Sequence, residues 1–198
     1  MKNLLILLTA TILVLGAATA VAEEDPREAE REALRAILAD VEKALNTGDY
    51  ALMKKHLGAN VVITYYNGEV TRSPAEMEAY FRRMTEGNNA PVAEFRTTAK
   101  VSAPADFYGD NTAVAWGTTQ EHYKLTSGME FDLNGLWTVT LYRTQGEWKI
   151  VALHFSTNLF ENPLLDNAQD FAWMVGIIAF LSGMIICMLV GRVVRARA

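Results

Sequence analysis

The spacing of apolar residues predicts three helices in the first half of the chain. A first amphipathic helix is predicted by apolar side chains that recur every three or four residues, at Leu34, Ile37, Leu38, Val41 and Leu45. Gly48 is placed to end this helix, and Asp49 can cap a short second helix over residues 50–57. The run Ser73-Pro74-Ala75-Glu76 combines a capping serine, a proline at the first helical position and a capping box, so it predicts the start of a third helix.

The second half of the chain changes to runs of β-branched and aromatic residues, which predict strands. We expect strands at residues 60–66, 92–104, 112–125, 130–144 and 147–156. Turn residues punctuate them at Asn67-Gly68, Asp110-Asn111, Ser127-Gly128 and Gln145-Gly146. Helices followed by a strand meander predict an α+β domain, in which three helices fill the concave side of a curved antiparallel sheet or leave a pocket there.

The C-terminal end of the chain predicts a membrane span. Residues 172–191 contain no charged side chain, and about twenty apolar residues suffice for a helix to cross a bilayer core of roughly 30 Å. Arg192, Arg195 and Arg197 follow this stretch, and the positive-inside rule keeps such an end in the cytoplasm. We therefore expect a juxtamembrane linker at 161–171, a transmembrane helix at 172–191 and a basic cytoplasmic tail at 192–198.

The N-terminal end predicts export. Lys2 precedes an apolar run over residues 4–14, and Ala20-Val21-Ala22 fits a signal-peptidase site. Residues 1–22 are thus predicted to be a signal peptide cleaved after Ala22; the alternative is an uncleaved anchor. Both interpretations leave residues 23–160 outside the cytoplasm, tethered by a single span to the plasma (inner) membrane and periplasmic in a Gram-negative cell.

Charge and cysteine content narrow the function classes. All 23 acidic residues lie between Glu23 and Asp170 and only 14 of the 18 basic residues do, so the exported part carries a net charge of about −9. Such a surface repels nucleic acid, which we exclude as a partner. The only cysteine is Cys187, inside the expected span, so the domain has no disulfide. No spacing of His and Cys residues suggests a metal site, and no cofactor is expected.

Several segments, taken in order, resemble the nuclear transport factor 2-like superfamily, which includes SnoaL-like proteins and ketosteroid isomerases. The segments are residues 44–49, the strand at 60–68, the helix start at 73–81, and the closing hairpin at 138–143, 146–150 and 154–156. The resemblance covers about residues 30–158. It implies a cone-shaped fold with a pocket at its open end, and frequent dimerisation through the outer face of the sheet.

The same resemblance argues against one reaction of the superfamily. A ketosteroid isomerase needs a carboxylate base and a tyrosine that holds the enolate oxygen. Counted along this chain, the base position falls on Tyr65 and the oxyanion tyrosine falls on Val41. Neither side chain can perform the required role.

His154 is the best remaining catalytic candidate. Strict alternation along the last strand places it on one face with Ile150, Ala152 and Ser156. An inward histidine there could act as a general base, with Ser156 assisting and His122 as the second catalytic candidate. The alternative is a structural histidine bonded to a backbone carbonyl or to Ser156, because one histidine without a located partner is weak evidence.

A second set of residues could line a ligand pocket. Either Glu121 or His122 must face inward, since neighbours on a strand point to opposite faces; the pattern favours a solvent-facing His122. Aromatic residues of the sheet could serve an apolar ligand, although they also form ordinary core. The expected ligand-binding set is Tyr65, Trp116, His122, Trp137 and His154.

Three functional hypotheses follow. The favoured one is a membrane-anchored, dimeric, non-catalytic domain that binds a small apolar ligand or a protein partner. The second is a tethered isomerase, dehydratase or hydrolase that acts on a hydrophobic molecule through His154. The third is a structural assembly module. Fold alone does not decide between them. A deep cavity that His154 does not contact would favour ligand binding.

Overall fold

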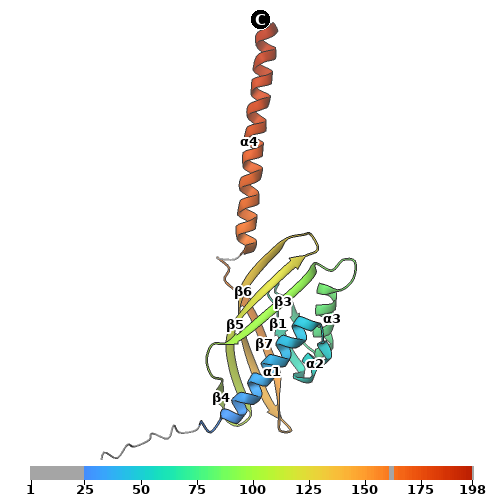
Figure 1. Cartoon of the computed structure of the whole chain (residues 1–198), viewed down its shortest axis with the longest axis vertical. Coiled ribbons are helices and arrows are strands. Elements are labelled where there is room, and N and C mark those ends of the chain that lie inside the picture. Colours follow the sequence, from blue (N-terminus) through green and yellow to red (C-terminus); the bar gives the residue numbers. More distant parts are fainter. Residues whose placement is uncertain (1–24, 161–162, 198) are drawn as a thin grey trace, which may run out of the picture.

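The computed structural model describes residues 25–160 and 163–197. The predicted signal peptide lies outside these residues. In chain order the elements are α1 (Glu28–Thr47), α2 (Tyr50–Lys55), β1 (Leu57–Thr64), β2 (Val70–Thr71), α3 (Pro74–Thr85), β3 (Val92–Val101), β4 (Asp106–Tyr108), β5 (Thr112–Leu125), β6 (Glu130–Thr144), β7 (Glu147–Thr157) and α4 (Pro163–Arg197). The α+β class is confirmed, with α1 to α3 on one face of a strongly bent sheet (Figure 1).

The helix boundaries follow from local chemistry. Gly48 ends α1 in the left-handed conformation, with φ of 71°. The Asp49 carboxylate accepts a hydrogen bond from the Leu52 N–H at 3.0 Å and so caps α2. The Ser73 hydroxyl caps α3 by accepting from the Glu76 N–H at 3.2 Å, and Pro74 occupies the first turn. All three starts or stops are those that the sequence predicts.

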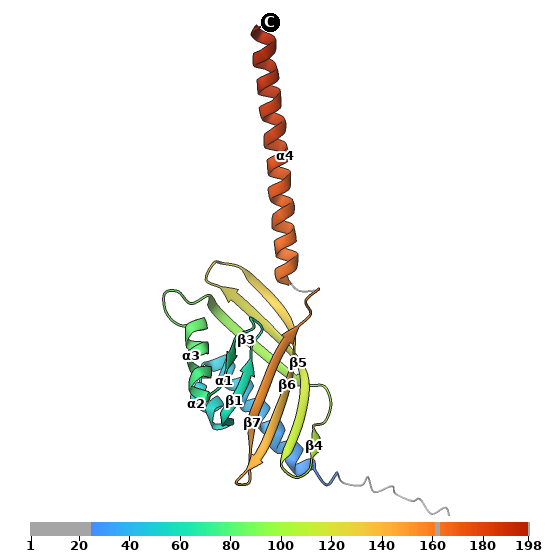
Figure 2. The same ribbon diagram turned by 180° about the vertical axis from the view of Figure 1, so that it is seen from behind.

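The sheet is mixed, which corrects the expectation of an antiparallel sheet. Its strand order is β2-β1-β7-β6-β5-β3, with β4 paired to β5. The β1 and β7 strands pair in parallel, whereas the pairings around β5 and β6 are antiparallel. Antiparallel neighbours can be joined by tight turns, but β1 and β7 are separated by most of the domain, so no local turn signal announces their pairing. The helices α1, α2 and α3 all lie behind β5, β6 and β7 when the sheet is viewed from its outer face (Figure 2).

Strand β7 contains a bulge that resets which side chains face the core. Thr140 of β6 pairs with Ala152, but the next β6 residue, Leu141, pairs with Ile150, which leaves Val151 as an extra residue. Ile150 and Leu153 consequently both point into the core, three positions apart. Strict alternation therefore fails on this strand.

The C-terminal helix α4 runs for 35 residues away from the domain (Figure 1). It spans about 52 Å at 1.5 Å per residue, so it exceeds the thickness of a bilayer core. It is long and apolar enough to cross a membrane, and the apolar window is not buried against the domain. The helix begins at Pro163, so the segment expected as a juxtamembrane linker is helical from that residue on.

Candidate functional site

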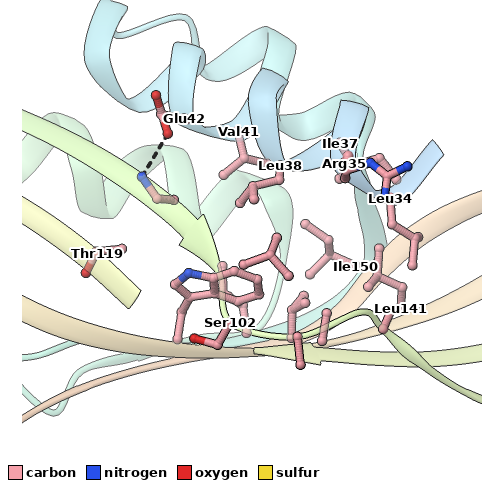
Figure 3. Close-up of a pocket in the computed structure, with 18 of the residues that line it drawn as sticks. Leu34, Arg35, Ile37, Leu38, Val41, Glu42, Ser102, Thr119, Leu141 and Ile150 are labelled. Carbon is pink, nitrogen blue, oxygen red and sulfur yellow. Dashed lines mark hydrogen bonds between the residues drawn. The ribbon is translucent and has the colours of Figure 1, made fainter. Parts of the chain in front are cut away.

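An apolar cavity of about 340 Å³ lies between α1 and the concave face of the sheet (Figure 3). One wall is the inner stripe of α1, and the floor comes from β5, β6 and β7. The loop after β3 completes the lining. The main apolar residues that line the cavity are Leu34, Ile37, Leu38, Val41, Leu45, Ala99, Val101, Ala115, Trp137, Val139, Leu141, Ile150, Leu153 and Phe155. A concave, mostly apolar site of this size is typical for a small ligand.

Two side chains of α1 fasten the helix to the edge strand β3 and so close one side of the cavity. The Asn46 amide donates to the Thr97 carbonyl at 2.8 Å and accepts from the Thr97 N–H at 2.7 Å. One helical turn earlier, the Glu42 carboxylate accepts from the Ala99 N–H at 2.8 Å (Figure 3). These bonds satisfy edge groups of β3 that the sheet itself leaves unpaired.

Several polar side chains around the cavity are already bound within the protein. Trp137 donates its indole N–H to the Thr118 carbonyl at 3.2 Å, and the Thr119 hydroxyl is bonded to the Tyr66 hydroxyl at 2.8 Å. At the rim, Arg31 pairs with Asp25 and donates to the Ala105 carbonyl. No described buried side-chain N or O atom lacks a hydrogen bond. The cavity therefore offers a ligand mainly shape and apolar surface, with the Ser102 hydroxyl as one polar group in its lining.

Two glycines make room for the large side chains of the floor. A Cβ atom on Gly117 would lie 1.9 Å from the Lys100 carbonyl oxygen and 2.6 Å from the Trp137 ring. A Cβ atom on Gly135 would lie 1.8 Å from the Tyr66 hydroxyl oxygen and 2.5 Å from that of Thr119. Glycine inside a strand often marks such a close approach.

Behind Thr119 lies a buried carboxyl group. Glu121, on the inner face of β5, is only 4% exposed. The Tyr123 hydroxyl donates to one of its oxygens at 2.7 Å, and the Tyr66 hydroxyl donates to the other at 3.3 Å. Burial raises the pKa of Glu121, an effect that hydrogen bonds from Tyr123, Tyr66 and Thr119 partly oppose. We call Glu121, Tyr123, Tyr66 and Thr119 the Glu121 cluster.

The structure corrects the expected orientation of His154. The bulge at Val151 shifts the alternation, so Leu153 and Phe155 line the cavity while His154 is exposed on the outer face. His154 pairs across the sheet with Thr64 and Thr138. Ser156, two residues on, faces the same outer side. Neither side chain reaches the cavity, so they cannot act there as a base and its assistant.

His122 also lies on the outer face, as its sequence pattern favoured. Its Nδ1 lies 2.8 Å from an Asp132 carboxylate oxygen and its Nε2 lies 3.3 Å from one of Glu130. Of the two neighbours Glu121 and His122, Glu121 is the one that points inward. The sequence could name Glu121 only as one of two choices, because nothing along the strand showed which face is concave.

The expected aromatic set is divided between three places. Trp137 lines the cavity. Tyr65 is buried in the core, stacked on Tyr80 with 3.7 Å between ring centroids, and hydrogen-bonded to Thr71 at 3.0 Å. Trp116 lies on the outer face and is 48% exposed. Trp116 and Tyr65 are thus not lining residues, whereas Val41 lies in the cavity wall as an apolar side chain.

The outer face of the sheet carries its own apolar surface. Its exposed members include Val62 on β1, Trp116 on β5 and Leu136 on β6, the last 50% exposed.

Among the described residues, no group of three or more His, Cys, Asp or Glu side chains is arranged to hold a metal ion.

Comparison with known proteins agrees with this architecture. The profile of the SnoaL-like domain matches residues 34–159. Among solved structures, a putative scytalone dehydratase from Novosphingobium aromaticivorans is 12% identical, with a TM-score of 0.58 over 67% of this chain and 87% of that one. A type 2 hexachlorocyclohexane dehydrochlorinase is 15% identical, with a TM-score of 0.59 over 69% of this chain and 90% of that chain.

A putative dehydratase of the NTF2-like family from Streptomyces avermitilis is 15% identical, with a TM-score of 0.54 over 67% of this chain and 99% of the other. No curated protein matches the sequence. At these identities the likeness to the solved structures establishes the fold alone.

Proposed function

The chain belongs to the SnoaL-like domain family, and on that premise we propose that it binds a small, uncharged apolar molecule in the cavity between α1 and the sheet, without catalysing a reaction. The observation that carries the proposal is the cavity itself, about 340 Å³ in volume and lined almost throughout by apolar side chains. Because the lining is mostly apolar and its charged side chains are bound within the protein, a charged ligand would lose its hydration and gain little in return.

The enzyme alternative has less support. The relatives with solved structures include proteins described as a putative dehydratase and a dehydrochlorinase. In this chain His154 lies outside the cavity, and Glu121 is enclosed by its own hydrogen-bond partners. A general base must come within hydrogen-bond reach of the proton that it removes, and neither residue meets that requirement in the cavity.

We propose further that the domain is a homodimer that pairs through the outer face of the sheet. Val62, Trp116 and Leu136 are exposed on that face, and large apolar side chains exposed on one face are typical of an interaction site. This pairing also supports the assembly role as a companion to ligand binding, because it would bring two α4 helices together.

Membrane attachment completes the proposal. The length and composition of α4 support a single span, with the three arginines at its end on the cytoplasmic side and the domain on the other. Protease treatment of spheroplasts, whose outer membrane no longer shields the periplasm, tests this topology: the domain should be digested without lysis of the inner membrane. Protection of the domain until lysis would contradict it.

Ligand binding is tested with the full chain purified in mild detergent. Native mass spectrometry after release from the micelle should show a small bound molecule that co-purifies with the protein. The variant Ala99→Trp, which fills the cavity, should lose that mass, and the control His154→Ala on the outer face should keep it. A wild-type chain without any bound mass, or a mass retained by Ala99→Trp, would contradict the proposal.

A further inference from the structure

The Glu121 cluster is a buried acidic group that ligand binding does not use. Glu121 lies on β5 between Thr97 of β3 and Leu133 of β6, both buried. Its recorded partners are the hydroxyl groups of Tyr123, Tyr66 and Thr119, and no cation acts on it among the described residues. A carboxylate in such a place would keep its charge without a counter-ion, which is costly in an apolar interior.

The cluster adjoins one end of the apolar cavity. Thr119 belongs both to the cluster and to the cavity lining, and its hydroxyl is bonded to Tyr66 at 2.8 Å. Phe155 also lines the cavity and packs on the Tyr66 ring, with 5.6 Å between centroids. Two residues that a ligand would touch are thus held by Tyr66, which in turn donates to Glu121.

The other titratable groups around Glu121 are phenols with raised pKa values, groups on the opposite face of the sheet, and Glu42 of α1. Tyr80 of α3 faces the cluster, and burial raises the pKa of its phenol to about 12; burial raises those of Tyr66 and Tyr123 as well. His122, Asp132 of β6 and Arg96 of β3 are the nearest charged or titratable neighbours in the strands, and they lie on the opposite face of the sheet. The inner face of α1 adds Glu42, whose carboxylate is bonded to Ala99.

We propose that the Glu121 cluster links ligand retention to pH: it holds the adjoining wall of the cavity in place while Glu121 carries a proton and loosens it when that proton leaves. The inference rests on the proposed ligand binding. The Tyr123 and Tyr66 hydroxyls donate to Glu121, but they do not supply the counter-ion that an ionised Glu121 would need in this buried place. An ionised Glu121 therefore draws in water, and water entering beside it displaces Tyr66 or Thr119 from their mutual bond. Thr119 and Phe155 then lose their support, and the ligand escapes more readily.

The test uses the full chain in uncharged maltoside micelles with N-phenyl-1-naphthylamine, a neutral apolar fluorophore, between pH 5 and pH 9. The cavity-filled variant Ala99→Trp measures partition into the micelle, and the difference from wild type gives binding in the cavity. The informative variant is Glu121→Gln, which cannot ionise. His122→Gln serves as the matched control, because it changes the neighbouring side chain on the outer face of the same strand. Hydrogen–deuterium exchange of peptides that contain residues 118–123, corrected for the intrinsic pH dependence, reports opening of the cluster in the same samples.

We expect the dissociation constant of wild type and His122→Gln to rise at least tenfold from pH 5 to pH 9, with faster exchange at 118–123. Glu121→Gln should bind with one affinity throughout. Cavity binding that ignores pH in wild type, or a pH dependence that survives in Glu121→Gln, would overturn the inference alone. Absence of cavity binding at every pH would instead overturn the proposed function and the retention that depends on it. If Glu121→Gln does not fold, unchanged exchange at 118–123 in wild type between pH 5 and pH 9 still overturns the inference.

Discussion

Gly135 leaves open the space that the Tyr66 hydroxyl occupies: a Cβ atom on this glycine would lie 1.8 Å from that oxygen. We therefore predict that Gly135→Ala displaces Tyr66, breaks its bonds to Thr119 and Glu121, and lowers the free energy of unfolding by about 1–3 kcal/mol. Urea denaturation measures the change. The control Thr138→Ala, on the outer face of the same strand, should cost much less. Equal stability of Gly135→Ala and wild type would show that the Tyr66 position is not constrained.

The buried Glu121 gives stability a pH dependence of predictable sign. Because burial raises its pKa, the folded protein keeps this proton at a pH where the unfolded chain has released it. The stabilising contribution is fully present below the ordinary glutamate pKa of about 4.5 and is lost as the pH rises through the raised value. Glu121→Gln should therefore gain stability relative to wild type as the pH increases from 5 to 9.

Urea denaturation at each pH measures this difference. The control Glu32→Gln changes an exposed carboxylate of α1, so its stability should run parallel to that of wild type. A constant difference between Glu121→Gln and wild type across the range would mean that Glu121 has an ordinary pKa in the folded protein.

Asn46 supplies both bonds to Thr97 and so fixes α1 against the edge strand. Asn46→Ala should lower the free energy of unfolding by about 1–3 kcal/mol, because it leaves a backbone donor and acceptor of β3 unpaired. Asn46→Asp keeps the acceptor but loses the donor, so it should recover only part of the loss. Thermal unfolding followed by circular dichroism compares them with the exposed control Asn60→Ala. A harmless Asn46→Ala would mean that packing alone holds α1 in place.

The sequence predicted the elements well because their ends depend on local chemistry. Gly48, Asp49 and Ser73 act within one turn of their own positions, and the Gln145-Gly146 turn has positive φ at both residues, as a tight hairpin requires. The two-residue β2 and three-residue β4 were not predicted, since such short strands depend on the neighbours that they pair with.

The candidate site was harder to predict because it depends on which face of the sheet each side chain points to, and on strand pairing between residues far apart in the sequence. One extra residue, Val151, moved His154 to the outer face. Trp116 and Trp137 lie on adjacent strands and have similar sequence surroundings, yet only the fold decides that Trp137 lies over Gly117 while Trp116 faces outward. The glycines inside β5 and β6 were the available signal for the crowded floor, since glycine weakens a strand unless something approaches it closely.

The outer face of the sheet makes a prediction about oligomeric state. If dimers form through Leu136 and its apolar neighbours, Leu136→Lys should convert the purified full chain to monomers, because a buried unpaired charge would face its copy across the interface. Analytical ultracentrifugation in detergent with matched buoyant density measures the mass. The variant Lys149→Ala, at the far end of β7, should leave the dimer intact and controls for a general effect of surface substitution. Dimers that persist in Leu136→Lys would exclude this face and would direct attention to α4, whose apolar window is not buried against the domain.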